Sequence, residues 1–182
     1  MDGGVFISHS STDAGAAADI CAVVEAAGRP CWIAPRDMRA GRSWGENIIH
    51  ALDRCTVLLL VLTQRANGSR QVLREVERAD GKGARIVTLR LDPMPLSPTL
   101  EYFLSLDHWL DATRPPLQQH LPALLAALET SALAPQRVHR AAPTQRSDHE
   151  LLAEFNELAP DDWDLAPRSR IGRFVQQLFA DR

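Results

Sequence analysis

Short apolar runs alternate with segments of helical spacing over residues 1–128. Five runs predict strands, at Val5–Ile7, Arg29–Ile33, Val57–Leu62, Arg85–Arg90 and His108–Leu110. The third run has no polar alternation, which is typical of a central parallel strand covered on both faces. Strands and helices that alternate in this way predict a parallel sheet with helices on both faces, because each right-handed crossover returns the chain to a parallel strand. The predicted fold class is α/β.

Start and stop signals place the helices between these strands. The first helix opens around residues 11–13 and ends before Gly28, and the second follows a capping box formed by Ser43 and Glu46. A third follows Ser69, and a fourth begins at residues 115–116, where two prolines suit a helix start. Residues 63–68 are expected to form a polar connection, and the proline-rich loop at residues 93–98 is expected to lack regular structure.

The pattern changes after residue 128. Residues 129–147 have no apolar periodicity, so we interpret them as a linker after a domain at residues 1–128. Ser147 and Glu150 form a second capping box, which predicts a short helix, and apolar spacing over residues 171–179 predicts another. This two-helix extension, residues 148–182, is too small to bury a core alone. We expect it to dock on the first domain, on a partner, or on a part of a longer protein.

Composition and charge narrow the class of protein. Of the 182 residues, 45% are hydrophobic, and the formal net charge of -3 argues against nucleic acid as a partner. The longest apolar run is far too short to cross a bilayer and no signal segment precedes the first strand, so we expect a cytoplasmic protein without a membrane partner. Cys21, Cys31 and Cys55 lie in apolar segments without C-x-x-C spacing and are expected to be reduced core residues.

The segment from Trp32 to Glu46 is longer than a simple turn and indicates a binding loop. It brings Arg36, Arg39 and Arg42 close together, and such a positive rim suits phosphate or an acidic partner surface. An ion pair within the loop, between Arg36 and its neighbour Asp37, is an equally good interpretation.

Ligands of open parallel sheets bind beyond the carboxyl ends of the strands. Here those ends carry residues 8–11, 34–42 and 63–69, so we expect three consecutive loops to form one pocket. The serines at 8, 10 and 11 offer hydroxyl groups to ribose or phosphate, His9 offers a ring for stacking, and helix capping is the alternative role for one serine. Trp32 fits a core position better than a ligand platform, and Trp44 is the better stacking candidate.

Glu75 is the carboxylate of the third helix that lies nearest to its buried stripe. With Val72 as the reference on a helical wheel, Glu75 lies about 60° away and Glu77 about 140° away. A carboxylate at this border can be partly desolvated while it faces a cleft, whereas Glu77 is expected to be solvated. The alternative is a surface ion pair between Glu75 and Arg74 or Arg78.

Four segments together resemble a bacterial TIR (Toll/interleukin-1 receptor) domain over about residues 4–128. They are VFISHSSTDAGAAADIC, CWIAPRDMRAGRSWGENIIHAL, VLLLVLTQRANGSRQVLREVERA and FLSLDHWLDA. The pattern W-I-A-P-R-D-x-x-x-G, which ends at Gly41, is similar to the BB loop of that family. The resemblance implies a flavodoxin-like sheet order, and either a self-associating signalling module or an NAD+ hydrolase and cyclase in bacterial defence against phage.

The resemblance also implies roles for individual residues. Family members with enzyme activity use a glutamate on the helix after the third strand, and S-R-Q-V-L-R-E-V places it at Glu75, although the family often has a tryptophan where this chain has Gln71 or Val72. NAD+ is then the substrate, with no cofactor and no metal, because nicotinamide leaves as a neutral molecule and one carboxylate can suffice. The candidate substrate-binding residues are Phe6, Ser8, His9, Ser10, Ser11, Trp32, Ala34, Arg36, Asp37, Gly41, Trp44 and Ser69.

Two roles remain open at this point. One is an NAD+-consuming effector that is switched on when protomers assemble through the loop from Trp32 to Trp44, and the other is a silent adaptor that binds only other TIR domains. Both imply homo-oligomers, and residues 148–182 are then a candidate link to a sensor domain or partner. A receiver-type phosphoacceptor domain disagrees with the sequence, since serines and Thr63 stand where such a domain needs acidic residues. Action on a nucleotide with another base is compatible with the same pocket.

Overall fold

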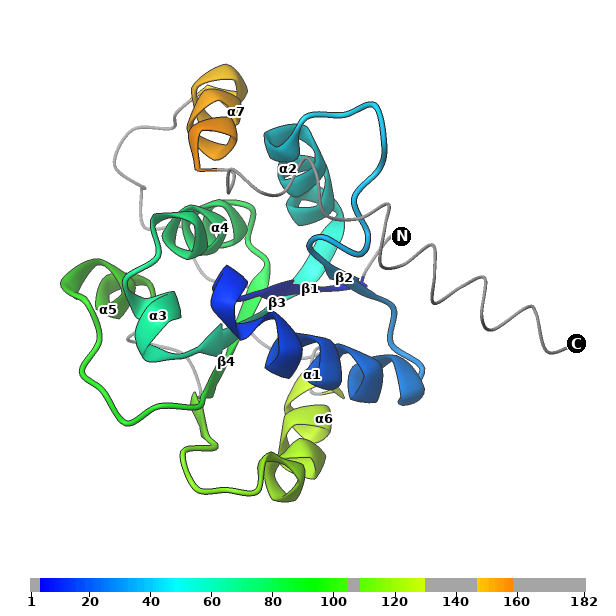
Figure 1. Ribbon diagram of the computed structural model, residues 1–182, viewed down its shortest axis with the longest axis vertical. Helices are drawn as coiled ribbons and strands as arrows, with labels where there is room; N and C mark the ends of the chain where they lie inside the picture. Colours follow the sequence, from blue (N-terminus) through cyan, green and yellow to red (C-terminus); the bar gives the residue numbers. More distant parts are fainter. Residues whose placement is uncertain (1–3, 105–108, 130–146, 159–182) are drawn as a thin grey trace, which may run out of the picture.

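Five parallel strands form one sheet in the order β2-β1-β3-β4-β5 (Figure 1). The computed structural model describes residues 4–104, 109–129 and 147–158. The strands are β1 (Gly4–Ser8), β2 (Cys31–Ile33), β3 (Cys55–Leu62), β4 (Arg85–Arg90) and β5 (Trp109–Asp111). This is the flavodoxin-like order, so the predicted α/β class and sheet order are confirmed.

Helices cover both faces of the sheet (Figure 1). One face carries α1 (Ala14–Ala26), which follows the short 3-10 turn η1 (Ser11–Asp13), and α6 (Leu121–Glu129), which follows η2 (Leu117–His120). The other face carries α2 (Trp44–Arg54) and α4 (Arg70–Gly81). The remaining helices of the described chain are α3 (Gln64–Asn67), α5 (Pro98–Leu104) and α7 (Asp148–Glu157).

The central strand β3 supplies side chains to both halves of the core. Val57, Leu59 and Val61 pack in the cluster under α1 and α6. The alternate residues Leu58, Leu60 and Leu62 pack in the cluster under α2 and α4. All six are 1% exposed or less, which explains why the sequence of this strand lacks polar alternation.

Several segments differ from the bounds expected from the sequence, among them the helix expected to begin at residues 115–116, which starts as η2 at Leu117 and becomes α-helical at Leu121. Strand β2 is shorter, because Pro30 has no N–H to donate and only its carbonyl oxygen bonds to Val5 N, at 2.9 Å. The connection after β3 contains α3, since the Thr63 hydroxyl caps it by accepting from Ala66 N at 3.0 Å. The proline-rich loop is irregular only as far as Ser97, because Pro98 begins α5 at a position where no N–H is needed.

Helix α7 docks on the first domain. Its predicted capping box is present, with the Glu150 carboxylate accepting from Ser147 N at 2.9 Å. Phe155 is fully buried in the core cluster of α2 and α4, and Glu154 forms an ion pair with Arg74 at 2.8 Å. The second helix predicted for the extension lies outside the described residues. The division of the chain into domain, linker and extension stays a prediction.

Gly45 of α2 lies in close contact with α7. Its backbone N donates to Asn156 Oδ1 at 2.8 Å, and a methyl group added at Gly45 would lie 2.9 Å from the carbonyl oxygen of Leu152. We expect Gly45→Ala to push α7 away and to weaken its docking by about 1–3 kcal/mol, the usual cost of overpacking. Amide hydrogen exchange in α7 measures this loss as faster exchange.

Gly15→Ala is the matched control for this change. Gly15 also lies in the first turn of a helix, but a methyl group there meets nothing within 4 Å. The control variant is expected to keep the α7 exchange rates of the wild type. Equal exchange in the two variants would show that α7 is not held through Gly45.

The sequence also led to expectations about membrane spans and about the cysteines. None of the helices in the described ranges has the length and apolar character needed to span a bilayer. Cys21 and Cys31 are buried and Cys55 is half-buried, and all three are free thiols. Their place in or beside the core is the predicted one.

Candidate functional site

Glu75 lies on α4 and faces the carboxyl end of β1. The residue is only 2% exposed, so it is buried more fully than the partial desolvation expected at the border of the apolar stripe. The Ser8 hydroxyl donates to Glu75 Oε2 at 2.5 Å, and Gln71 Nε2 donates to Oε1 at 3.0 Å. Within the described part of the chain these are neutral donors, so the carboxylate is hydrogen-bonded at both oxygens without a cationic partner.

The surface ion pair considered for Glu75 is wrong. Arg74 pairs with Glu77 at 2.6 Å, and Arg78 pairs with Asp53 at 2.8 Å. Both arginines therefore point to other carboxylates. Glu77 is half-buried in its ion pair with Arg74 rather than fully solvated, which differs from the expectation.

Burial raises the pKa of Glu75 to about 7, because the ionised form loses its hydration. The hydrogen bonds from Ser8 and Gln71 act in the opposite direction and lower the pKa. A carboxyl whose pKa is raised toward neutral by burial beside a cavity is a candidate functional group.

A small cavity lies in front of Glu75. Its volume is about 10 Å³, close to the space that one water molecule needs. A ribose with its nicotinamide does not fit unless part of the wall moves. The cavity is lined by Phe6, Ile7, His9, Ser11, Ala34, Trp44, Gln71 and Glu75.

The structure divides the candidate substrate-binding residues into two groups. The first group lines this cavity or bonds to Glu75, and consists of Phe6, Ser8, His9, Ser11, Ala34 and Trp44. The second group is not part of the cavity lining, and consists of Ser10, Trp32, Arg36, Asp37, Gly41 and Ser69. Two of the three predicted loops thus reach Glu75, and the third contributes Ser69 only as the N-cap of α4, where its hydroxyl accepts from Val72 N at 3.3 Å.

The expectation that one of the serines at 8–11 caps the first helix is wrong. Ser10 precedes η1 without a capping hydrogen bond, and its hydroxyl lies 3.0 Å from that of Thr12. Asp13, which precedes α1, does not cap it either, because its carboxylate accepts from the Thr63 hydroxyl at 2.6 Å. Ser8, at the end of β1, instead donates its hydroxyl hydrogen bond to Glu75.

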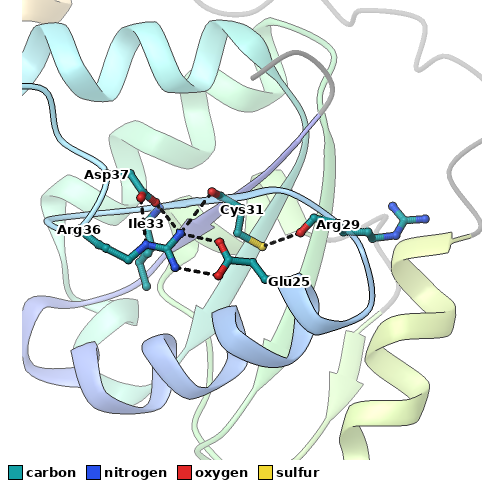
Figure 2. Close-up of polar contacts among 6 residues, drawn as sticks. All are labelled: Glu25, Arg29, Cys31, Ile33, Arg36 and Asp37. Atoms are coloured by element: carbon teal, nitrogen blue, oxygen red, sulfur yellow. Dashed lines mark hydrogen bonds and ion pairs between the residues drawn. The ribbon is translucent and has the colours of Figure 1, made fainter. Parts of the chain in front are cut away.

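The first arginine of the loop is part of an ion-pair cluster (Figure 2). Arg36 pairs with Glu25 of α1 at 2.7 Å and with Asp37 at 2.8 Å. Asp37 also accepts from the backbone N of Ile33 at 2.8 Å. The ion-pair interpretation of Arg36 and Asp37 is therefore confirmed, and the pair ties the loop to α1 and β2 and does not line the Glu75 cavity.

Other parts of the loop also have structural roles. Trp32 stacks on Phe6 with ring centroids 4.9 Å apart and an angle of 13° between the ring planes, and it is half-buried against the core cluster, so the core position expected for it is only partly reached. Gly41 has φ +85°, a left-handed conformation that glycine adopts without strain.

Two residues of the cavity were not among the candidates, namely Ile7 and Gln71. Gln71 could have been found from the sequence, because it lies four residues before Glu75 and therefore on the same face of the helix. His9 is buried, and this burial lowers its pKa, which favours the neutral form of its ring. In the described ranges, no group of three or more His, Cys, Asp or Glu side chains is placed to hold a metal ion.

Comparisons with known proteins agree on the fold. A family model described as TIR domain matches residues 5–125. The TIR domain of the Toll-related receptor TRR-2 from Hydra magnipapillata is similar at TM-score 0.59 and 17% identity, over 69% of this chain and 97% of that one. A metazoan TIR-STING receptor from C. gigas is similar at TM-score 0.53 and 20% identity, over 68% of this chain and 39% of that one. No curated protein matches the chain.

Proposed function

The chain belongs to the TIR domain family, and from this premise we propose that it is an NAD+ glycohydrolase whose catalytic carboxylate is Glu75. The observation that carries the proposal is a carboxylate only 2% exposed, held by Ser8 and Gln71, beyond the carboxyl end of β1. Burying such a group is unfavourable for folding, and a buried carboxylate with a raised pKa beside a cavity is a candidate functional group.

The reaction breaks the bond between the nicotinamide nitrogen and C1′ of the ribose. The bonding electron pair moves to the pyridinium ring, which becomes neutral, and positive charge develops on the sugar. The ionised Glu75 stabilises this cation electrostatically, as the carboxylates of glycosidases do. Water then adds to C1′ and releases a proton, so the products are nicotinamide, ADP-ribose and H⁺.

Cyclisation is a variant of the same reaction. A ring nitrogen of the substrate's own adenine then replaces water as the nucleophile at C1′, and the product is cyclic ADP-ribose. The role of Glu75 is the same for both products, because the sugar cation is common to them. The ratio of the two products therefore reports which nucleophile reaches C1′.

The cavity has space for about one water molecule, so access to Glu75 requires movement of part of its wall, and we propose that the moving part contains Ala34 and Trp44. We place this movement under the control of self-association through the loop from Trp32 to Trp44. The Arg36 ion pairs hold one end of this loop, so a neighbouring protomer that binds the loop can change the position of Trp44. An effector that consumes cytoplasmic NAD+ on assembly fits a role in bacterial defence against phage.

The test is nicotinamide release from NAD+ by the wild-type protein, both dilute and clustered on a solid support. We expect release to rise steeply on clustering, and chromatography of the products to separate linear from cyclic ADP-ribose. A clustered protein that releases no nicotinamide would overturn the proposal.

The closed cavity favours one other function, that of a TIR module without catalysis. For this function we expect concentration-dependent assembly, measured by light scattering, that Arg36→Ala abolishes, and no NAD+ turnover in any state. Turnover that depends on assembly excludes it.

A further inference from the structure

A second and larger hollow lies on the α2 side of the sheet, toward the amino ends of β1 and β3. Its volume is about 180 Å³, and Gly4 and Cys55, the first residues of these strands, form part of its wall. Trp32 lines this groove, and Phe6 lines the Glu75 cavity. Because these two rings stack on each other at 4.9 Å, they separate the two spaces, and the groove is not an extension of the Glu75 cavity.

Asn47 fixes the loop at the edge of this groove. It is 5% exposed, and its Oδ1 accepts from Arg39 N at 2.8 Å. Its Nδ2 donates to the carbonyl oxygens of Arg39 at 3.3 Å and Arg42 at 3.4 Å. His50 and Arg54 follow Asn47 on the same face of α2, so loop and helix bring their basic side chains to one groove.

The charge of the groove lining is positive although the chain has a net charge of -3. The lining residues include Arg39, Arg42 and Arg54, and the carboxylate of Asp37, which also belongs to the lining, is paired with Arg36. The pKa of His50 is lowered by burial and then by these three arginines, with only a weaker opposite effect from Asp53. An anion in the groove would relieve this repulsion among like charges.

We propose that this groove binds a phosphomonoester, with the phosphate between Arg39, Arg42 and Arg54 and the attached ring against Trp32. Guanidinium groups suit this ligand, because their planar N–H donors match the oxygens of a phosphate. The volume is below the range of drug-sized ligand sites, so it suits a phosphate with one small ring rather than a whole dinucleotide. The site is separate from Glu75 and does not depend on NAD+ cleavage.

Isothermal titration calorimetry on the full chain tests this site with inorganic phosphate, ribose 5-phosphate and uncharged ribose, all without NAD+. We expect both phosphates to bind, more weakly as the salt concentration rises, and ribose to give no heat. The indole N–H of Trp32 and the side-chain amide of Asn47 should shift in ¹⁵N NMR spectra of the same titrations. Tighter binding of ribose 5-phosphate supports the contact between its ring and Trp32, and equal binding of the two phosphates would overturn the proposal of a phosphomonoester site.

The variants compare two pairs of arginines at equal net charge. Arg39→Gln with Arg42→Gln is expected to reduce affinity at least about tenfold, since each removes charge-assisted hydrogen bonds. Arg29→Gln with Arg114→Gln should retain wild-type affinity, because neither residue lines the groove, and Figure 2 shows the Arg29 side chain pointing away from the Arg36 ion pairs. The proposal would be overturned if neither inorganic phosphate nor ribose 5-phosphate binds. It would also be overturned if both double variants melt like the wild type and lose affinity equally.

Discussion

Replacement of Glu75 by glutamine is expected to lower kcat/KM for NAD+ on the order of 10³-fold, the cost of removing a preorganised charge from a reaction centre. Glutamine has nearly the same shape and can still accept from Ser8, so the change removes mainly the negative charge. Positive charge develops on the sugar only in the transition state, and we therefore expect the loss in kcat rather than in KM. Nicotinamide release from clustered protein provides the measurement.

Glu77→Gln is the matched control for this experiment. It removes the same charge from the same helix, but its carboxylate pairs with Arg74 at 2.6 Å and does not line the cavity. The control is expected to keep near wild-type turnover. Wild-type turnover in Glu75→Gln would remove Glu75 from the chemistry, and an equal loss in both variants would indicate damage to α4 instead.

The position of Glu75 could be predicted from the sequence because it depends on local periodicity. The 3.6-residue repeat of α4 places Glu75 beside Val72 and Val76, and these valines are fully buried. The same holds for β3, whose apolar run predicts a strand covered on both faces and so the centre of the sheet. Both capping boxes, at Ser43 and Ser147, could likewise be predicted from a serine followed three residues later by a glutamate.

The features that could not be predicted depend on contacts between distant residues. Ser8 and Glu75 are 67 positions apart, and Arg36 and Glu25 are 11 apart, so nothing in either local pattern indicates the partner. The spacing of Arg36, Arg39 and Arg42 in the sequence predicts one positive rim. In the structure, Arg36 forms an ion pair with Glu25 of α1. Asn47 instead bonds to the backbone of Arg39 and Arg42 at the edge of the 180 Å³ groove.

The size of the Glu75 cavity is likewise a result of packing. The pattern placed an aromatic ring beside the site, and the structure makes Trp44 a wall, since its side chain is only 8% exposed. This wall keeps water from Glu75 and explains why its pKa is raised although two donors bond to it. Opening of the wall is therefore expected both to admit a ligand and to favour ionisation of the carboxylate.

The free energy of unfolding is expected to depend on pH, because the ionised form of Glu75 is unfavourable in its buried position. The ordinary pKa of the carboxyl is 4.5 and its folded pKa is about 7, so between these values the folded state holds a proton that the unfolded state has lost. Stability from this group is fully present below pH 4.5 and falls by about 3 kcal/mol as the pH rises through 7.

Urea unfolding of the wild type and of Glu75→Gln, at a series of pH values from 4 to 8, measures this term. Other carboxyls, such as those of Glu46 and Asp111, have lowered pKa values and act in the opposite direction, but they are common to both proteins and cancel in the difference. We expect Glu75→Gln to gain about 3 kcal/mol on the wild type between the two ends of the series. A difference that is constant with pH would mean that Glu75 ionises as easily in the folded protein as in the unfolded chain, and the carboxylate would then have solvent rather than a closed cavity around it.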